Sequence, residues 1–517
     1  MSLQRSGIVL VVLSTLACAT PGKGESGAAK IPRGGRLHLA GEPLPVPNVM
    51  PEGEIREKYR EALMAEQRAH EADDAGKKPE ARALYVQAAD GFMGFANKYT
   101  GSNWDESLRY HAAELYMEGG RLPQAVGTAE TLAENAKDPM SKALGWLLAA
   151  NARVRAKDLQ PPRIIPAEER KNPPQPRELT SSWKSFTDAA REALAAPPPA
   201  AEAGGEPPKR SVSLAQLALV AGQAEFAFDR MEPARGLLAG ALERGAGQPE
   251  LFAAAAPLYL RTWADAGDTQ GYEAALAKLR AQAQTLAQAG PPAQGTGDGS
   301  SDAKAADPVK AVDAADFSIR YGAARRLFEQ GKYAEAGGAF EQLAEGGKGG
   351  DPAAALDAAG FAWEKAGDAK KAAALREKVV KDHKDSDVAP GATLALAGLR
   401  SKTGDHAAAA KLYETWLERW PKGTQRCAVL RNAAIASDQA EQWVEAAKKY
   451  ERFAADADCT KESADGALLA YYRAGRLYDY LKKKAEAKAA FQQVVAVQGA
   501  KSPEAQQALE DAKKRVK

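Results

Sequence analysis

A short pattern recurs through residues 316–517 of this chain: a small residue lies five positions after a turn, and an aromatic residue often follows one helical turn later. The small residue is an alanine in each copy, and successive alanines are 36, 37, 37 and 41 residues apart. That interval is too short for a domain but suits one helix-turn-helix unit. The pattern therefore predicts an all-α solenoid of stacked helix pairs. The alanines are Ala336, Ala372, Ala409, Ala446 and Ala487.

The same register continues upstream at longer, interrupted intervals, so about ten helix pairs are expected in all. We expect an irregular N-terminal array at 54–289 and a regular C-terminal array at 309–517, which ends in a capping helix. A Gly-rich segment at 290–308 joins them, because such a composition cannot bury enough apolar area to order itself. Proline-rich insertions at 160–178 and 197–209 interrupt the first array, since proline is excluded from helix interiors.

The N-terminus has the features of a bacterial export signal. Residues 1–18 hold one arginine and an apolar run too short to span a bilayer, and residues 19–53 read as a flexible tether. The segment before Cys18 resembles the lipobox of bacterial lipoproteins, which predicts lipidation of that cysteine. Ala17 and Ala19 also fit ordinary signal cleavage. The first alternative predicts the periplasmic side of the outer membrane, and the second a soluble periplasmic protein.

Charge and composition argue against several classes of function. The chain has 70 basic and 68 acidic residues, a formal net charge of +2, so no nucleic-acid partner is expected. Its five histidines show no metal-ligand spacing, and no G-x-S-x-G motif occurs. A glycine-rich stretch at 295–299 has no lysine where a phosphate-binding loop needs one. We therefore expect no catalytic residue, no metal site and no cofactor.

Two further cysteines, Cys427 and Cys459, flank the repeat unit that contains Ala446. One falls at the start of that unit's first helix and the other just past the end of its second. In an antiparallel helix pair those two ends lie side by side, so a disulfide is possible in an oxidising compartment. Two unrelated buried thiols are the alternative, and thiol titration distinguishes them.

The repeat resembles the tetratricopeptide repeat, in which small residues occupy two fixed positions of the helix pair, followed by an aromatic residue and a proline. Ala397, Ala409, Tyr413 and Pro421 match those places in one unit. The long units resemble those of periplasmic and outer-membrane proteins in the families of YbgF and BamD. The resemblance implies a superhelix whose concave groove is lined by the first helix of each pair. The groove positions carried over are Tyr321, Arg325, Phe328, Phe361, Lys365, Arg431, Asp438, Tyr472, Arg476 and Tyr480.

Some tetratricopeptide domains clamp a carboxylate with asparagines in this groove. Gly398 and Ile435 stand where such asparagines would be, so that mode of binding is not expected here. The predicted function is a non-enzymatic scaffold for other envelope proteins, anchored to the membrane through an N-terminal lipid, in a machine for assembly, secretion or gliding motility. The alternatives are a periplasmic module that binds peptidoglycan or peptides, and an accessory subunit of an envelope enzyme.

Overall fold

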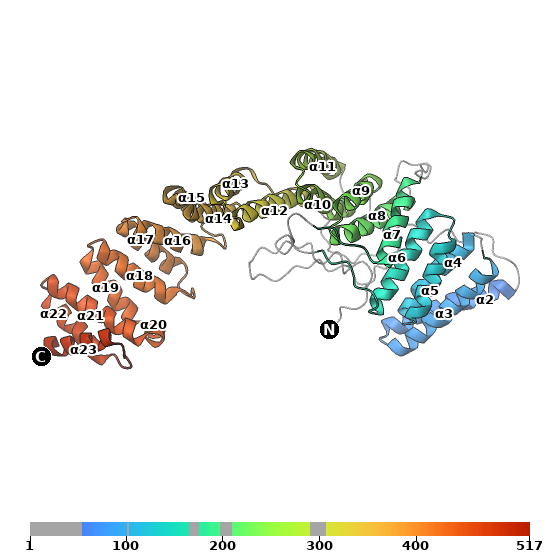
Figure 1. Ribbon diagram of the computed structural model, residues 1–517. Coiled ribbons are helices and arrows are strands. Elements are labelled where there is room, and N and C mark those ends of the chain that lie inside the picture. Colours follow the sequence, from blue (N-terminus) through green and yellow to red (C-terminus); the bar gives the residue numbers. More distant parts are fainter. Residues whose placement is uncertain (1–53, 101–102, 165–174, 197–208, 290–306, 517) are drawn as a thin grey trace. The chain divides into compact units, whose positions relative to one another are not determined.

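The computed structural model describes residues 54–100, 103–164, 175–196, 209–289 and 307–516. Within these ranges the chain forms 22 helices, and each packs mainly against its neighbours in sequence (Figure 1). Ten helix pairs follow one another, with α20 inserted between α19 and α21 and α23 at the end. The predicted fold class, an all-α solenoid of the tetratricopeptide type, is confirmed.

The chain divides by its internal contacts into two units. Unit 1 is Met1–Ile319 with Lys348–Gly350, and unit 2 is Arg320–Gly347 with Asp351–Lys517. The division falls inside α12. The segment predicted as a linker, 290–308, lies almost wholly outside the described residues.

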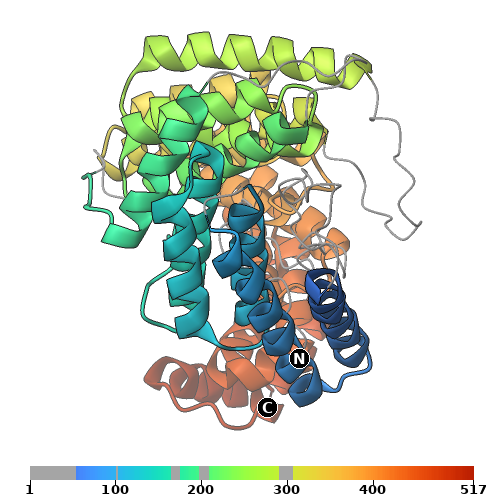
Figure 2. The ribbon, with the colours of Figure 1, turned by 90° about the vertical axis from the view of Figure 1, so that its right-hand side faces the viewer.

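Successive helices of unit 1 lie side by side (Figures 1 and 2). The described helices of unit 1 are α2 (Glu54–Asp74), α3 (Lys78–Lys98), α4 (Asn103–Glu118), α5 (Leu122–Asn135), α6 (Pro139–Arg155), α7 (Ser181–Ala195), α8 (Lys209–Ala227), α9 (Met231–Arg244), α10 (Pro249–Asp265) and α11 (Thr269–Ala289). The first part of α12 (Pro308–Glu329) also belongs to this unit. It is held there by Asp316, which accepts hydrogen bonds from the Tyr272 hydroxyl at 2.6 Å and from Arg280 at 3.0 Å.

Unit 2 contains the remainder of α12 and all later helices. These are α13 (Tyr333–Gly346), α14 (Pro352–Lys365), α15 (Ala369–Asp382), α16 (Ala389–Lys402), α17 (His406–Arg419), α18 (Arg426–Gln439), α19 (Trp443–Ala455), α20 (Ala457–Glu462), α21 (Ala464–Tyr480), α22 (Lys484–Ala496) and α23 (Pro503–Val516). Most are 13 or 14 residues long, which is the length that a repeat of about 37 residues allows.

Small residues sit where the two helices of a pair meet. All five repeat alanines are buried, and so are the aromatic residues that follow one helical turn later, such as Phe340 and Tyr413. At Gly475, an added Cβ would come within 2.7 Å of the Phe491 ring. A larger side chain at that position would force the two helices apart, so the repeated small residues explain the close packing.

The turns inside the pairs need a left-handed residue five positions before the repeat alanine. Glycine meets this need three times, and Gly331, for example, has a φ of 78°. In the last two pairs the glycine is absent, yet Glu441 and Lys482 adopt the same conformation, with φ of 60° and 59°. The turn geometry is therefore kept at the expense of local strain, since only glycine enters this region freely.

Several sequence predictions fall outside the described residues. Cys18, the tether at 19–53 and most of the insertion at 197–209 are among them. Of the insertion at 160–178, the described parts are not helical, and Arg177 N–H donates to the Phe228 carbonyl at 2.9 Å. No helix in the described part of the chain is both long and apolar enough to cross a membrane.

Candidate functional site

The ten predicted groove residues all lie on the first helices of successive pairs, α12, α14, α18 and α21. The repeat register assigns equivalent positions on the first helices, and the position directly after the small residue is Arg325, Phe361, Gly398, Ile435 or Arg476. We call these five residues, together with Lys365, Arg431 and Tyr480, the first-helix face of unit 2. Each of the eight is exposed or half-exposed.

An aromatic cluster joins the first two pairs of unit 2. The Phe328 and Phe361 rings stack with centroids 5.2 Å apart, and Phe328 also contacts Tyr333 at 5.0 Å. Tyr321 packs against Phe340 at 4.9 Å. Tyr321 and Phe328 are therefore packing residues between pairs, whereas Phe361 leaves 46% of its surface exposed. An exposed phenylalanine held by a neighbouring ring is a rigid apolar contact site.

The predicted acidic groove residue, Asp438, is already occupied. Its carboxylate accepts two hydrogen bonds from Arg473 on α21, at 2.7 and 3.0 Å, and a weaker one from the Tyr450 hydroxyl at 3.3 Å. Such a bidentate pair fixes both side chains. Asp438 thus connects α18 to α21, and the Arg473 partner 35 residues away was not identified from the sequence.

Tyr472 and Arg476 lie together on α21. The Tyr472 hydroxyl donates to Asp511 of α23 at 2.8 Å, and Arg476 donates to that same hydroxyl at 3.3 Å. The Arg476 guanidinium lies over the Tyr472 ring, 6.0 Å from its centroid. Tyr472 is therefore engaged with the capping helix, whereas Arg476 remains exposed and forms no ion pair within the described residues.

Tyr480, the last residue of α21, is 68% exposed. Its ring meets the edge of the Trp443 ring with centroids 4.9 Å apart. Trp443 begins α19 and was not among the predicted site residues. A rigid aromatic pair with most of one ring in solvent offers a large contact area at little entropic cost.

The charges on this face are unbalanced. Its carboxylates are paired internally, and the pairs are Glu329 with Arg325, Glu364 with Arg376 and Lys402, Asp438 with Arg473, and Asp479 with Arg515. Arg431 is exposed and has no ion pair or hydrogen bond in the described part of the chain. Lys365 lies 5.5 Å from the Phe361 ring and has no carboxylate partner there. The face therefore presents cations without counter-charges.

Three residues of the face were passed over at the sequence stage of reasoning or seen only as departures from a carboxylate clamp. Ile435 is 37% exposed, and Leu469 on α21 is 36% exposed. Gly398 has no atom within 4 Å of the place where a Cβ would be, so the space in front of α16 is open. The repeat register contained the signal, because Gly398 and Ile435 occupy the position of Phe361 in the next two pairs.

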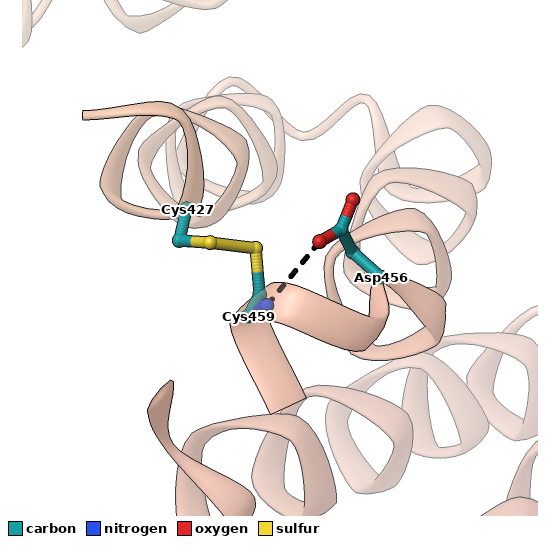
Figure 3. A group of neighbouring side chains, drawn as sticks. All are labelled: Cys427, Asp456 and Cys459. Atoms are coloured by element: carbon teal, nitrogen blue, oxygen red, sulfur yellow. Dashed lines mark hydrogen bonds between the residues drawn. A yellow bond between two sulfur atoms is a disulfide. The ribbon is translucent and has the colours of Figure 1, made fainter. Parts of the chain in front are cut away.

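Cys427 and Cys459 form a disulfide, with Cα atoms 5.2 Å apart (Figure 3). Cys427 lies at the start of α18, and Cys459 lies in the short α20 that follows α19. Asp456 caps α20 by accepting from the Cys459 N–H at 3.2 Å, and it pairs with Arg426. Burial opposes ionisation of Asp456, but the hydrogen bond from Arg426 outweighs it and lowers the carboxyl pKa.

These three side chains are also the one group in the described residues with three potential metal ligands close together. Metal binding by cysteine requires thiolates, and here both sulfurs are bonded to each other. In this oxidised state the group acts as a cross-link between α18 and α20. It therefore holds in place the helix that carries Arg431 and Ile435.

Unit 1 contains a cluster of titratable groups between α2 and α4. His111 Nε2 lies 2.8 Å from Glu66 Oε2, and the Tyr85 hydroxyl lies 2.9 Å from His70 Nδ1. Burial alone would lower the pKa of His111, but hydrogen bonds to Glu114 and Glu66 raise it to about 9. A protonated His111 between two carboxylates is a structural ion pair. No spacing in the sequence indicated it, because the partners come from different helix pairs.

No protein-family model matches this sequence, and no sequence among curated proteins matches it either. Three solved structures are similar in fold. A Cut9–Hcn1 hetero-tetramer of the APC/C has a TM-score of 0.36 at 12% identity, covering 89% of this chain and 99% of that one. A tetratricopeptide repeat protein from Parabacteroides merdae has a TM-score of 0.22 at 12% identity, covering 59% and 99%.

The yeast Tom70 structure has a TM-score of 0.23 at 13% identity, covering 89% of this chain and 96% of that one. Scores and identities this low carry no argument about function. The assignment of the fold rests instead on the helix pairs, the buried repeat alanines and the left-handed turns of this chain.

Proposed function

We propose that this protein is a non-enzymatic protein-interaction scaffold of the bacterial cell envelope and that the first-helix face of unit 2 binds its partner. One observation carries the proposal: exposed apolar residues recur at equivalent positions of successive first helices. Phe361, Ile435 and Tyr480 each leave more than a third of their surface in solvent. Rigid aromatic and aliphatic groups of this kind, bordered by cations, are the usual anchors of protein interfaces.

The envelope location is supported by residues of two kinds. The first 18 residues have the pattern of an export signal that ends in a lipobox-like Cys18. Cys427 and Cys459 are joined in a disulfide, which persists in oxidising compartments such as the periplasm. Together they favour an exported protein, anchored by lipid at the periplasmic side of the outer membrane. Its partners would be other components of a machine for assembly, secretion or gliding motility.

A non-enzymatic role is supported by what the titratable groups do. His111 is held between Glu66 and Glu114, and the two cysteines near α18 are bonded to each other. Glu225, which is fully buried, pairs with Arg191 and Arg230. Each of these groups is engaged in holding helices together, which is a structural use of charge.

Affinity purification of the full chain from detergent-solubilised envelopes of the native cells tests the scaffold proposal. We expect a partner in near-stoichiometric amount that is lost from the variant F361D/I435D. The same pair of changes on exposed second-helix positions, A407D/V495D, is the matched control and should retain it. Recovery of the same proteins with all three forms, or of none, would contradict a partner on this face. Sedimentation with purified peptidoglycan tests the alternative ligand.

The location is tested separately. Incorporation of labelled palmitate into the wild type, and its loss in Cys18→Ala, is the expected result. An unlabelled but exported protein would favour ordinary signal cleavage. A protein that remains in the cytoplasm with reduced Cys427 and Cys459 would overturn the envelope assignment.

A further inference from the structure

We propose that the first-helix face of unit 2 recognises a short extended segment of its partner, in which one apolar side chain is flanked on both sides by acidic residues. This inference rests on the proposed function, because it names the kind of partner that the same face would bind. It is carried by three features of the face: an open position at its centre, apolar walls on either side, and cations without counter-charges.

The open position is Gly398 on α16. A Cβ added there would have no atom within 4 Å, and the same is true of Gly391 on the same helix. Neighbouring first helices carry Phe361 and Ile435 at the register position of Gly398. The middle helix thus presents bare backbone where its neighbours present large apolar groups. A side chain of a ligand can enter this space without displacing any residue.

The walls are held in place by contacts between neighbouring first helices. Phe361 stacks on Phe328 of α12 at 5.2 Å. Lys402 of α16 reaches Glu364 of α14 at 3.5 Å. Side chains of successive first helices therefore touch. Phe361 and Ile435, exposed by 46% and 37%, are the apolar groups of the two helices on either side of Gly398. An apolar side chain in that position would be buried from both sides.

The charges determine what flanks the apolar side chain. Lys365 on α14 and Arg431 on α18 are exposed and lack carboxylate partners in the described residues, and Arg476 donates only to the Tyr472 hydroxyl. The carboxylates of the face are all paired within the protein. A ligand with acidic groups would meet unpaired cations, whereas a basic ligand would meet repulsion without a free carboxylate.

The spacing of the ligand follows from helix packing. Packed helices lie about 8–10 Å apart, and an extended chain advances about 3.3 Å per residue, so roughly three residues pass from one helix to the next. Acidic residues about three positions before and after the apolar one would reach Lys365 and Arg431. A nucleic-acid backbone suits this face less well, because it carries a charge at every residue and would place charge against Phe361 and Ile435.

Selection of random twelve-residue peptides displayed on phage, with the full-length protein as target, tests the inference. We expect enrichment of Leu, Phe or Met with Asp or Glu about three positions away on both sides. Enriched peptides without an acidic bias, or no enrichment at all, would overturn it. Heparin that displaces the enriched peptide and binds as tightly to K365E/R431E as to the wild type would equally count against it.

Binding of the enriched peptide, measured by fluorescence anisotropy, then tests the residues. K365E/R431E should weaken binding at least tenfold, and a peptide with its acidic residues changed to lysine should regain affinity for that variant only. K411E/K488E is the matched control, since both lysines are exposed, unpaired residues of second helices, α17 and α22. Equal loss in the control and the test variant would contradict recognition by this face.

Filling the open position gives an independent test. Gly398→Leu should reduce peptide binding at least tenfold, whereas Gly338→Leu, at an equally open glycine of α13, should leave it unchanged. Both substitutions replace a glycine inside a helix, so neither should lower the melting temperature. Unchanged binding in Gly398→Leu would refute the central position. If a native partner is retained by K365E/R431E but lost by F361D/I435D, the scaffold proposal stands and the acidic ligand does not.

Discussion

The two units are built from the same helix pairs but use charge in opposite ways. Of the buried charged side chains in the described residues, all but Arg376 lie in unit 1. Glu225 of unit 1 is fully buried between Arg191 and Arg230, and Arg109 pairs with Asp105 across one turn of α4. In unit 2 the charges lie mostly at the surface.

This difference shows how each unit is stabilised. Unit 2 repeats one solution, with a buried alanine and a buried aromatic residue in most pairs. Unit 1 has irregular spacing, and polar networks join helices of different pairs, as between His111 of α4 and Glu66 of α2. Buried ion pairs cost desolvation and demand fixed geometry. Unit 1 is thus held in one arrangement by its charges, and unit 2 keeps cations free on its first-helix face.

Exposed apolar side chains differ between the units as well. In unit 1 the large ones are Leu63 and Met64, both on α2. In unit 2 they are spread over successive first helices at Phe361, Ile435 and Tyr480. A single exposed pair is common on protein surfaces, whereas a recurring line is typical of an interface.

The largest effect is expected from removing the counter-charges of Glu225. The variant R191A/R230A leaves this carboxylate buried and unpaired, which typically costs about 3–5 kcal/mol. Urea unfolding should show the transition of unit 1 at lower denaturant and the transition of unit 2 unchanged. Arg452→Ala, which removes an exposed partner of Glu414, is the control and should cost at most about 1 kcal/mol. Equal effects of the two changes would contradict the contrast between the units.

Loss of the disulfide should affect unit 2 alone. Cys427 and Cys459 are 32 residues apart, and closing a loop of that size stabilises by about 3–4 kcal/mol. We expect C427S/C459S to lower the stability of unit 2 by that amount, and reductant to do the same to the wild type but not to the variant. Titration of the denatured, unreduced protein should find neither thiol. Two reactive thiols at these positions would show that the bridge does not form.

The pH dependence should reside in unit 1. The folded-state pKa of His111 is raised from 6.5 to about 9, so its contribution to stability is complete below about pH 6.5. It is lost as the pH rises through 9, and at about 1.36 kcal/mol per pKa unit the loss is on the order of 3 kcal/mol. Unfolding of the wild type from pH 6 to 9.5 should show this fall, and H111Q should flatten it. H383Q, a histidine change in unit 2, should leave the slope intact.

The smallest effect concerns the two strained turns of unit 2. Glycine in place of Glu441 or Lys482 should raise stability by roughly 1 kcal/mol each, because both residues adopt a left-handed conformation that glycine enters without strain. Glu445→Gly, inside α19, should instead lose about 1 kcal/mol. A loss at Glu441 as large as that at Glu445 would mean that the turn conformation is not as described.

The fold could be predicted from the sequence because the same small residues return at fixed intervals. Ala397 and Ala409, for example, mark the contact of the two helices in one pair. The two turns without glycine were also placed correctly, since Ala446 and Ala487 kept the register. What repeats along a chain is visible in one sequence, because each copy supports the others.

The site was predicted less completely, for physical reasons. Asp438 carries the right side chain for an interface, but a guanidinium from another helix pair neutralises it. Such long-range pairing has no local signature. Gly398 and Ile435 were noted only as lacking a clamp, although the register placed them beside Phe361. The network around His111 in unit 1 was not foreseen, because its members share no spacing.

Site-specific photocrosslinking tests the central claim most directly, that unit 2 binds its partner through the first-helix face. Benzoylphenylalanine would replace Ile435, or Leu63 on α2 of unit 1, in the full chain within the native cells. Both positions are exposed apolar residues of first helices. We expect a discrete crosslinked partner from position 435 and none from position 63. A crosslink from position 63 alone, or equal crosslinks from both, would contradict the claim.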